Sequence, residues 1–342
     1  MILQNTLYVT TQGAYVGKDG EAVAVRVEGA TVLRVPLHHL AGIVCFGQVS
    51  CSPALMGVCG ERDVAISFLT ESGRFLARVE GPVSGNVLLR RAQYRWADDP
   101  GQTAAVARAI VAGKIVNGRS VLRRALRDHS GMAGRDAVEC AVDRLGGVLA
   151  RLRDERDVER VRGLEGEAAQ HYFGVFDHLV TARKSVFAFT GRSRRPPQDP
   201  LNALLSFVYV LLVHDVRAAL ESVGLDPQVG FLHRDRPGRP GLALDVMEEF
   251  RPWLADRLVL SLINRQQVTA DGFRTEEGGA VLMNDATRRA VLTAWQERKR
   301  EELTHSFLAE RMPVALAMQM QARLLARYIR GDVDAYPPFV WK

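Results

Sequence analysis

The N-terminal part of the chain alternates short apolar runs with turn-forming residues. Runs rich in Val, Ile, Tyr and Phe continue as far as Glu80, separated by the glycine-containing turns KDG, EGA and ESG. Runs of this composition between such turns are typical of β-hairpins. Among them, Ser52 and Pro53 open an apolar segment that ends at Gly60, which is the pattern of a capped short helix. We therefore expect a small, mainly β N-terminal domain that includes one helix.

The spacing of the apolar residues changes after residue 86. They then recur every three or four positions with charges between them, as in TAAVARAIVAGKIVNGRSVLRRALRDH and AVLTAWQERKREEL, which predicts amphipathic helices. The turn formers ADDPG predict a break between the two regions. Pro313 and Gly331 are placed to begin and end the last helix. The C-terminal segment DVDAYPPFVWK is expected to be extended. The chain is thus expected to be an α+β protein, with a β domain over residues 1–97, a linker over 98–102 and a larger all-helical domain over 103–342.

Composition narrows the class of protein. Hydrophobic residues make up 47% and charged residues 25% of the 342 positions, as in ordinary folded domains. The longest apolar stretch, residues 201–213, is shorter than the roughly 20 residues of a bilayer span and predicts a buried core helix. The N-terminus has no basic region before an apolar run, and the four cysteines form no CxxC pair. We expect a cytoplasmic protein with no membrane partner, and its net charge of +6 is compatible with an anionic ligand.

The most informative segment is GFLHRDRPGRPGLALDVMEEFRP, residues 230–252. His233 precedes a loop punctuated by Pro and Gly, and the helical pattern that follows places Asp245 and Glu248 three positions apart on one face. Arg234 and Arg236 lie in the loop. Carboxylates and an imidazole suit Mg2+ or Mn2+, and guanidinium groups suit phosphate, so the segment favours metal-assisted phosphate chemistry. The alternative is that the carboxylates pair with the arginines on a solvated surface.

A further carboxylate stands in RGLEGEAAQHYFGVF. Glu165 shares a predicted helix face with two alanines and Tyr172, and small side chains beside a carboxylate leave room for a ligand or another helix. The alternative for Glu165 is an acid in the first turn of a helix, where it complements the helix dipole.

Basic residues gather in two further places. The segment TARKSVFAFTGRSRR carries basic and aromatic residues without acidic ones, and a helix around GKIVNGRSVLRR presents a basic face. Such patches can clamp a nucleic-acid backbone, and the alternative is an ordinary solvated surface. The candidate nucleic-acid contacts, including the two loop arginines above, are Lys114, Arg183, Arg192, Arg194, Arg195, Arg234 and Arg236.

The segments RGLEGEAAQHYFGVF, GRSRRPPQDPLNALLSFVY and 230–252, in this order, closely resemble the CRISPR-associated integrase, the universal subunit of spacer acquisition, in its type I-C form. The resemblance extends to CSPALMGVCGERDVAISFLTESGRFLARV, GNVLLRRAQYR, GKIVNGRSVLRRALRDH and YPPFVWK, so it covers nearly the whole chain. It implies a β domain used for homodimerisation and a helical domain with a divalent-metal site. The family ligands correspond to Glu165, His233 and Glu248, and Asp245 matches a neighbouring acid that supports the site. These four residues are expected to be catalytic.

The resemblance also implies chemistry and partners. Mn2+ or Mg2+ is the expected cofactor, because a cation held by two carboxylates and an imidazole keeps positions open for a phosphodiester oxygen. The terminal 3′-OH of captured DNA would attack a phosphodiester at the repeat boundary of a CRISPR array, and water in its place would make the site a nuclease. Expected partners are double-stranded protospacer and repeat DNA, a second copy of the chain, a small CRISPR-associated subunit that bridges two dimers into a heterohexamer, and an accessory nuclease that trims the incoming DNA.

The residues alone leave two other functions open. A non-catalytic DNA-binding scaffold would use its carboxylates only to brace its arginines, and would bind DNA without metal dependence or strand breakage. A metallophosphoesterase would act on small nucleotides and not on DNA. A P-loop is not supported, because Ile115 follows Gly113-Lys114 at the position where Ser or Thr is needed.

Overall fold

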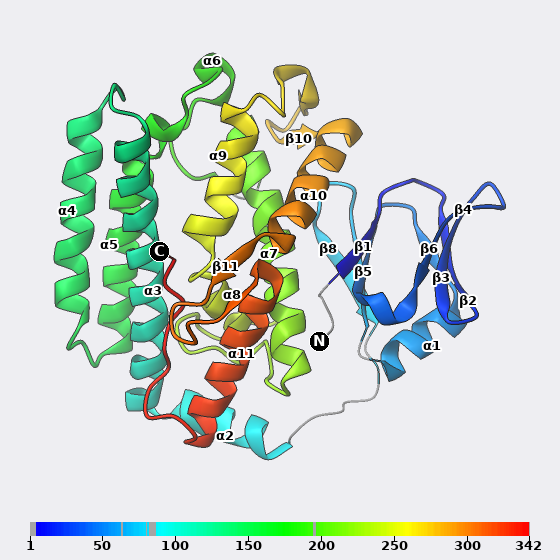
Figure 1. The fold of residues 1–342 in the computed structure, drawn as a ribbon, viewed down its shortest axis with the longest axis horizontal. Coiled ribbons are helices and arrows are strands. Elements are labelled where there is room, and N and C mark those ends of the chain that lie inside the picture. Colours follow the sequence, from blue (N-terminus) through cyan, green and yellow to red (C-terminus); the bar gives the residue numbers. More distant parts are fainter. Residues whose placement is uncertain (1–4, 63, 80, 82–86, 194–195, 342) are drawn as a thin grey trace.

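The N-terminal region is built from two four-stranded sheets (Figure 1). The computed structural model describes residues 5–62, 64–79, 81, 87–193 and 196–341. One sheet has the order β4-β3-β2-β6, and the other has the order β1-β5-β7-β8 with β8 antiparallel to β7. The strands are β1 (Asn5–Val9), β2 (Tyr15–Asp19), β3 (Ala22–Val27), β4 (Ala30–Pro36), β5 (Leu40–Phe46), β6 (Ser50–Cys51), β7 (Ala65–Leu69) and β8 (Phe75–Val79). The predicted β region is confirmed.

One helix, α1 (Pro53–Glu61), accompanies these sheets as predicted. Ser52 Oγ accepts a hydrogen bond of 3.1 Å from the Leu55 amide, and Pro53 occupies the first turn, where its missing N–H breaks no helical bond. Leu55 is fully buried and belongs to a cluster of apolar residues from both sheets, including Val16 of β2 and Ile43 of β5. The capping signal in the sequence therefore located this helix correctly.

The expected linker over residues 98–102 is a tight junction between two helices. α2 (Val87–Asp98) ends there, and α3 (Pro100–Asp128) begins after the single residue Asp99. Asp99 Oδ1 accepts a 2.8 Å hydrogen bond from the Gln102 amide, and Pro100 starts the helix. The predicted break is therefore present, and its turn formers cap the second helix, while the domain boundary placed here stays a prediction.

The rest of the chain is mostly helical. Its helices are α4 (Arg135–Leu152), α5 (Val158–Gly174), α6 (Lys184–Phe187), α7 (Pro200–Ser222), α8 (Gly241–Met247), α9 (Arg257–Asn264), α10 (Asp285–Arg300) and α11 (Val314–Arg330), with a π-helical turn, η3 (Arg251–Asp256), after α8. Two short antiparallel pairs, β9 (Phe273–Thr275) with β10 (Val281–Met283) and β11 (Glu302–Thr304) with β12 (Arg311–Pro313), correct the expectation of an all-helical region. The α+β class is confirmed.

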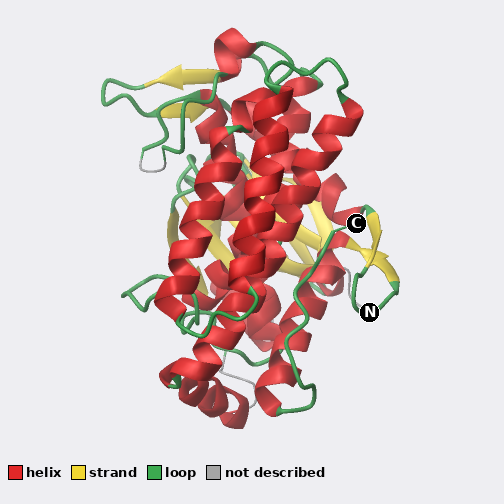
Figure 2. Ribbon diagram, turned by 90° about the vertical axis from the view of Figure 1, so that its left-hand side faces the viewer, coloured by secondary structure: helices red, strands yellow, loops and turns green. Residues whose placement is uncertain are grey.

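Helix α7 is the centre of the helical part. By length and hydropathy alone it could cross a membrane, but 61% of its apolar window is buried inside the protein, as predicted for a core helix. Figure 2 shows the long helices side by side in a layer in front of the strands. Val44 and Phe46 of β5 and Leu69 of β7 belong to the same buried cluster as α7, and the Phe46 ring lies 5.8 Å from that of Phe207. The two regions therefore share one core across this sheet.

A buried ion pair lies where the sheet meets the helices. Lys299 of α10 is 2% exposed, and its Nζ lies 3.0 Å from Asp215 Oδ2 of α7 and 3.3 Å from Thr6 Oγ1 of β1. Trp295 Nε1 donates to the same aspartate at 2.9 Å. A fully paired charge of this kind joins the first strand to two helices far along the chain.

Candidate metal centre

Helices that are far apart in the sequence meet around the ammonium group of Lys114. Lys114 lies in α3, Glu165 in α5 and Glu248 at the end of α8. Lys114 Nζ pairs with Glu165 Oε1 and lies 2.6 Å from Glu248 Oε2. The three side chains are 11%, 27% and 4% exposed in that order. Two carboxylates thus share one largely buried cation.

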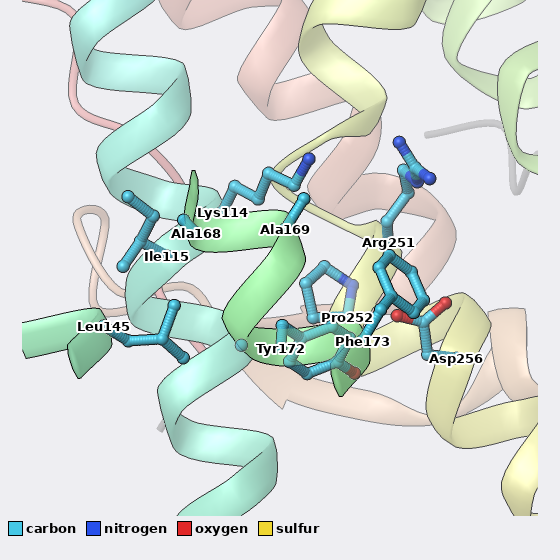
Figure 3. A pocket seen from close by; sticks show the side chains of 11 residues that line it. Lys114, Ile115, Leu145, Ala168, Ala169, Tyr172, Phe173, Arg251, Pro252 and Asp256 are labelled. Carbon is cyan, nitrogen blue, oxygen red and sulfur yellow. The ribbon is translucent and has the colours of Figure 1, made fainter. Parts of the chain in front are cut away.

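Glu165 lies in the middle of its helix. α5 begins at Val158, Asp157 caps it, and Glu159 is the acid of the first turn. The alternative that Glu165 complements the helix dipole in the first turn is therefore wrong. The predicted face of small residues is real, since Ala168 and Ala169 line a pocket beside Lys114 (Figure 3).

Glu248 is held as a buried carboxylate. Burial raises its pKa, but the positive charges of Arg251 and Lys114, with a contribution from His233, outweigh burial and hold the pKa at about 2. Arg251 donates a hydrogen bond to Glu248 Oε1. The second oxygen, Oε2, is buried and accepts no hydrogen bond of regular geometry, although the Lys114 ammonium lies next to it.

The imidazole of His233 is oriented by Asp245. His233 Nδ1 lies 2.7 Å from Asp245 Oδ1, and the backbone amides of Phe231, Leu232 and His233 donate to the two carboxylate oxygens at 2.6, 2.9 and 2.9 Å. Asp245 has no exposed surface. A proton on Nδ1 would donate to this carboxylate oxygen, and the tautomer with that proton keeps a lone pair on Nε2 for a ligand.

Two glycines make this arrangement possible. A Cβ on Gly230 would lie 2.7 Å from both Asp245 Oδ2 and the carbonyl carbon of Gly241, and a Cβ on Gly241 would lie 2.7 Å from the Gln228 carbonyl oxygen. The loop before His233 therefore packs directly on the start of α8. Any side chain at these positions would push the histidine away from its aspartate.

The side chains here suit a divalent cation by their chemistry, although the described positions do not bring three of them together around one point. Within the residues that the structure describes, no group of three or more His, Cys, Asp and Glu side chains lies close enough together to bind one ion. The two carboxylates nevertheless converge on one position of positive charge, and the buried Glu248 Oε2 faces that position with the Lys114 ammonium 2.6 Å away. Carboxylate oxygens with one imidazole nitrogen suit Mn2+ or Mg2+. Glu165, His233 and Glu248 could hold such an ion, and Asp245 could orient the histidine.

We call Lys114, Glu165, His233, Asp245 and Glu248 the centre. Three residues that the sequence did not single out, Arg251, Tyr209 and Asp256, lie beside it. The guanidinium of Arg251 lies 4.4 Å from the centroid of the Tyr209 ring, and the Tyr209 hydroxyl donates to Asp256 at 2.5 Å. Figure 3 shows Arg251 and Lys114 extending toward the same side of the pocket, with Asp256 below Arg251. The one signal for Arg251 was its position three residues after Glu248, a spacing that lets side chains meet on a helix.

The candidate DNA contacts lie in different surroundings. Lys114 is inside the centre. Arg183 is exposed and donates to Gln266 at 3.1 Å, Arg234 is exposed and pairs with Glu159 at 2.6 Å, and Arg236 is exposed in the loop after His233. Arg192 is half-buried, where it donates to Asn202 and stacks on Tyr209. Arg194 and Arg195 lie outside the described residues.

A family model described as CRISPR associated protein Cas1 matches residues 7–297. The chain belongs to the Cas1 family. It is 58% identical over 338 residues to CRISPR-associated endonuclease Cas1 1 of Chlorobaculum tepidum, with 99% of this chain and 98% of that protein covered. It is 54% identical over 344 residues to CRISPR-associated endonuclease Cas1 2 of Rhodospirillum rubrum, with 99% of each covered. It is also 37% identical over 337 residues to a Cas4 exonuclease/Cas1 endonuclease fusion of Rhodospirillum rubrum, with 97% of this chain and 57% of the fusion covered.

Known structures have the same fold. A Cas1 protein from Thermotoga maritima has a TM-score of 0.83 at 21% identity, with 97% of this chain and 99% of that chain covered. A chain of a Cas6-RT-Cas1 and Cas2 complex has a TM-score of 0.83 at 23% identity, with 100% of this chain and 37% of that chain covered. The family predicted from the sequence is confirmed, and the type I-C assignment stays a prediction.

Proposed function

We propose that this Cas1 chain is a divalent-metal-dependent DNA endonuclease and integrase that inserts captured DNA into a CRISPR array. The observation that carries the proposal is the convergence of Glu165 and Glu248 on one cation beside an oriented His233. The relatives that are 58% and 54% identical bear the name of Cas1 endonucleases, and they match this chain over nearly its whole length.

Glu165, His233 and Glu248 would hold Mn2+ or Mg2+, which when bound stabilises the negative charge that develops on an attacked phosphodiester. Asp245 keeps the proton of His233 on Nδ1 and fixes the ring. Arg251 donates a hydrogen bond to Glu248 Oε1, so the other oxygen, Oε2, faces Lys114. Lys114 balances the carboxylates in the metal-free protein, and its charge becomes available to the DNA backbone once another cation takes its place.

The reaction itself requires no protein nucleophile. The 3′-OH of the captured DNA loses its proton and forms a new bond to phosphorus at the repeat boundary, the original P–O bond breaks, and the departing 3′ oxygen takes up a proton, so no net proton is consumed. One phosphodiester bond replaces another, so no external energy source is needed. With water as the nucleophile the same centre hydrolyses DNA.

The partners proposed with this function are double-stranded protospacer and repeat DNA, a second copy of the chain, a small bridging Cas subunit and a trimming nuclease. The likeness to a chain of a Cas6-RT-Cas1 and Cas2 complex supports a Cas2-type partner, and the Cas4/Cas1 fusion supports a trimming nuclease. The heterohexamer of two dimers around the bridging subunit belongs to the same proposal.

The test is Mn2+-dependent strand transfer of a short duplex into a supercoiled repeat array, with the small bridging subunit present. Glu165→Gln and Glu248→Gln should each lose transfer and nuclease activity. Glu167→Gln is the matched control, because Glu167 lies on the same helix as Glu165 but pairs with Arg151 at 2.5 Å near the surface. Full activity of Glu248→Gln would rule out this residue as a ligand, and activity on mononucleotide esters alone would favour a small-molecule phosphoesterase.

A further inference from the structure

The last residues of the chain are bound against the helices that carry the centre. In Figure 1 the dark-red tail leaves the end of α11 and runs alongside α3. Asn117 Nδ2 donates to the Phe339 carbonyl at 2.9 Å, and Asn117 Oδ1 accepts from the Trp341 amide at 2.7 Å. Glu249 accepts from the Phe339 amide and from the Tyr336 hydroxyl, both at 2.6 Å. We call residues 336–341 the tail.

The two residues that anchor the tail, Asn117 and Glu249, lie close along the chain to residues of the centre. Asn117 follows Lys114 by three positions on α3, and Glu249 follows Glu248 directly. Asn117 Nδ2 also donates to the Glu249 carbonyl at 2.7 Å. The tail, α3 and the end of α8 are therefore joined by one set of buried hydrogen bonds.

The packing around the tail is close. A Cβ on Gly113, the residue before Lys114, would lie 2.9 Å from Pro338 Cβ and 3.3 Å from Glu249 Cγ. The Phe339 ring is 1% exposed and stacks on Phe250 at 5.4 Å. The tail therefore fills space that neither helix can fill alone, and the spacing between α3 and the end of α8 depends on it.

We propose that the tail positions Glu248 against Lys114 and Glu165, with Asn117 and Glu249 as positioning residues. The inference rests on the proposed function, because it concerns how the ligands of that metal centre are held. Without the tail, the buried Glu249 carboxylate keeps only its hydrogen bond from Gln321 among the contacts named here, and Asn117 keeps only its bond to the Glu249 carbonyl. The end of α8 is then held less firmly against α3. Loss of such supporting contacts weakens metal binding about 10- to 100-fold.

The test measures Mn2+ binding to the full chain without DNA, by electron paramagnetic resonance titration. Asn117→Ala should raise the Mn2+ Kd about 10-fold or more. The matched control is Asn264→Ala, because Asn264 clamps another passing segment in the same way, donating to the Leu179 carbonyl and accepting from the Thr181 amide, both at 2.9 Å. That segment supplies no residue to the centre, so the control should bind Mn2+ as the unmodified chain does.

A second variant covers the case in which Asn117→Ala does not fold. Trp341→Ala removes stacking on Trp253 and the contacts with the guanidinium groups of Arg124 and Arg257, but it keeps both anchors. It should raise the Mn2+ Kd in a folded chain. Strand transfer by either variant should recover at saturating Mn2+, whereas Glu248→Gln should not.

The outcomes separate this inference from the function on which it rests. If the unmodified chain binds Mn2+ and the folded tail variants bind it equally tightly, the tail has no positioning role and the inference is overturned, while the metal centre stands. If the unmodified chain binds no Mn2+, the proposed function fails and the inference fails with it. Weaker binding in the tail variants, with unchanged binding in Asn264→Ala, supports the inference.

Discussion

Lys114 Nζ lies 2.6 Å from Glu248 Oε2 while it also pairs with Glu165, so a single ammonium group balances both carboxylates. Two carboxylates this close to one another, one of them almost fully buried, repel unless a positive charge lies between them. The arrangement therefore requires a cation at this position. The ammonium group of Lys114 supplies a positive charge there.

Removal of this ammonium should make the protein depend on metal for stability. Lys114→Met should lower the free energy of unfolding of the metal-free protein by about 3 to 5 kcal/mol, as when one partner of a buried ion pair is lost. Added Mn2+ should then raise the Tm of the variant more than that of the unmodified chain. Thermal unfolding with and without Mn2+ measures this. Lys184→Met is the control, because Lys184 pairs with Asp177 on the surface, and an equal Mn2+ effect in all three proteins would contradict the prediction.

The contact between Asp245 and His233 should control metal affinity. In Asp245→Asn the amide group faces backbone N–H donors, so the imidazole loses its fixed orientation and its fixed Nδ1 proton. We expect Mn2+ binding to weaken about 10- to 100-fold. Nitrogen NMR of the histidine should show a mixture of tautomers in the variant and one tautomer in the unmodified chain. An unchanged tautomer together with unchanged affinity would disprove the role of Asp245.

The candidate DNA contacts should divide into two groups. Arg236 is exposed, so Arg236→Ala should weaken duplex binding and reduce the slope of log K against log salt by about 1. Arg192 is half-buried, donates to Asn202 and stacks on Tyr209, so Arg192→Ala should mainly lower the Tm. DNA titrations at several salt concentrations, with thermal unfolding, separate the two effects. A larger change of salt slope for Arg192→Ala would reverse the assignment.

The buried pair of Lys299 and Asp215 should affect stability without affecting the centre. Lys299→Met leaves the aspartate buried with Trp295 as its remaining polar partner here, and we expect a loss of about 3 to 5 kcal/mol in denaturant unfolding. The pair joins β1, α7 and α10, and none of these elements carries a residue of the centre. The Mn2+ affinity of the folded variant should therefore be unchanged. A large change in Mn2+ affinity would mean that this joint and the centre are coupled.

Asp256 predicts a pH dependence of stability. Burial raises its pKa to about 6, and the hydrogen bond from Tyr209 and the charges of Arg251 and Arg192 offset this only in part. The folded protein therefore holds this proton more tightly than the unfolded chain, so the stabilisation is present at low pH and is lost as the pH rises through about 6. Asp256→Asn removes this dependence. The stability of the variant relative to the unmodified chain should rise from pH 4 to pH 8, and a constant difference would contradict the assignment.

Local patterns in the sequence predicted much of the fold. The capping residues before α1, the apolar run of α7 and the Pro and Gly that bound α11 each act within a few residues, so they can be read without the fold. The turn formers around Asp99 likewise marked a real break between two helices, and the domain boundary placed there stays a prediction. The short strands β9 to β12 were missed because three residues are too few to establish a period.

The sequence by itself determined the chemistry available to this protein, through the resemblance that singled out Glu165, His233, Asp245 and Glu248. Only the tertiary structure decided which of these groups meet. It placed Lys114, expected at a DNA surface, between two carboxylates, gave Asp245 the role of orienting the histidine, and brought the tail against Glu249. The physical reason is that such contacts join residues on different helices, and their distance depends on how the helices pack and not on spacing along the chain.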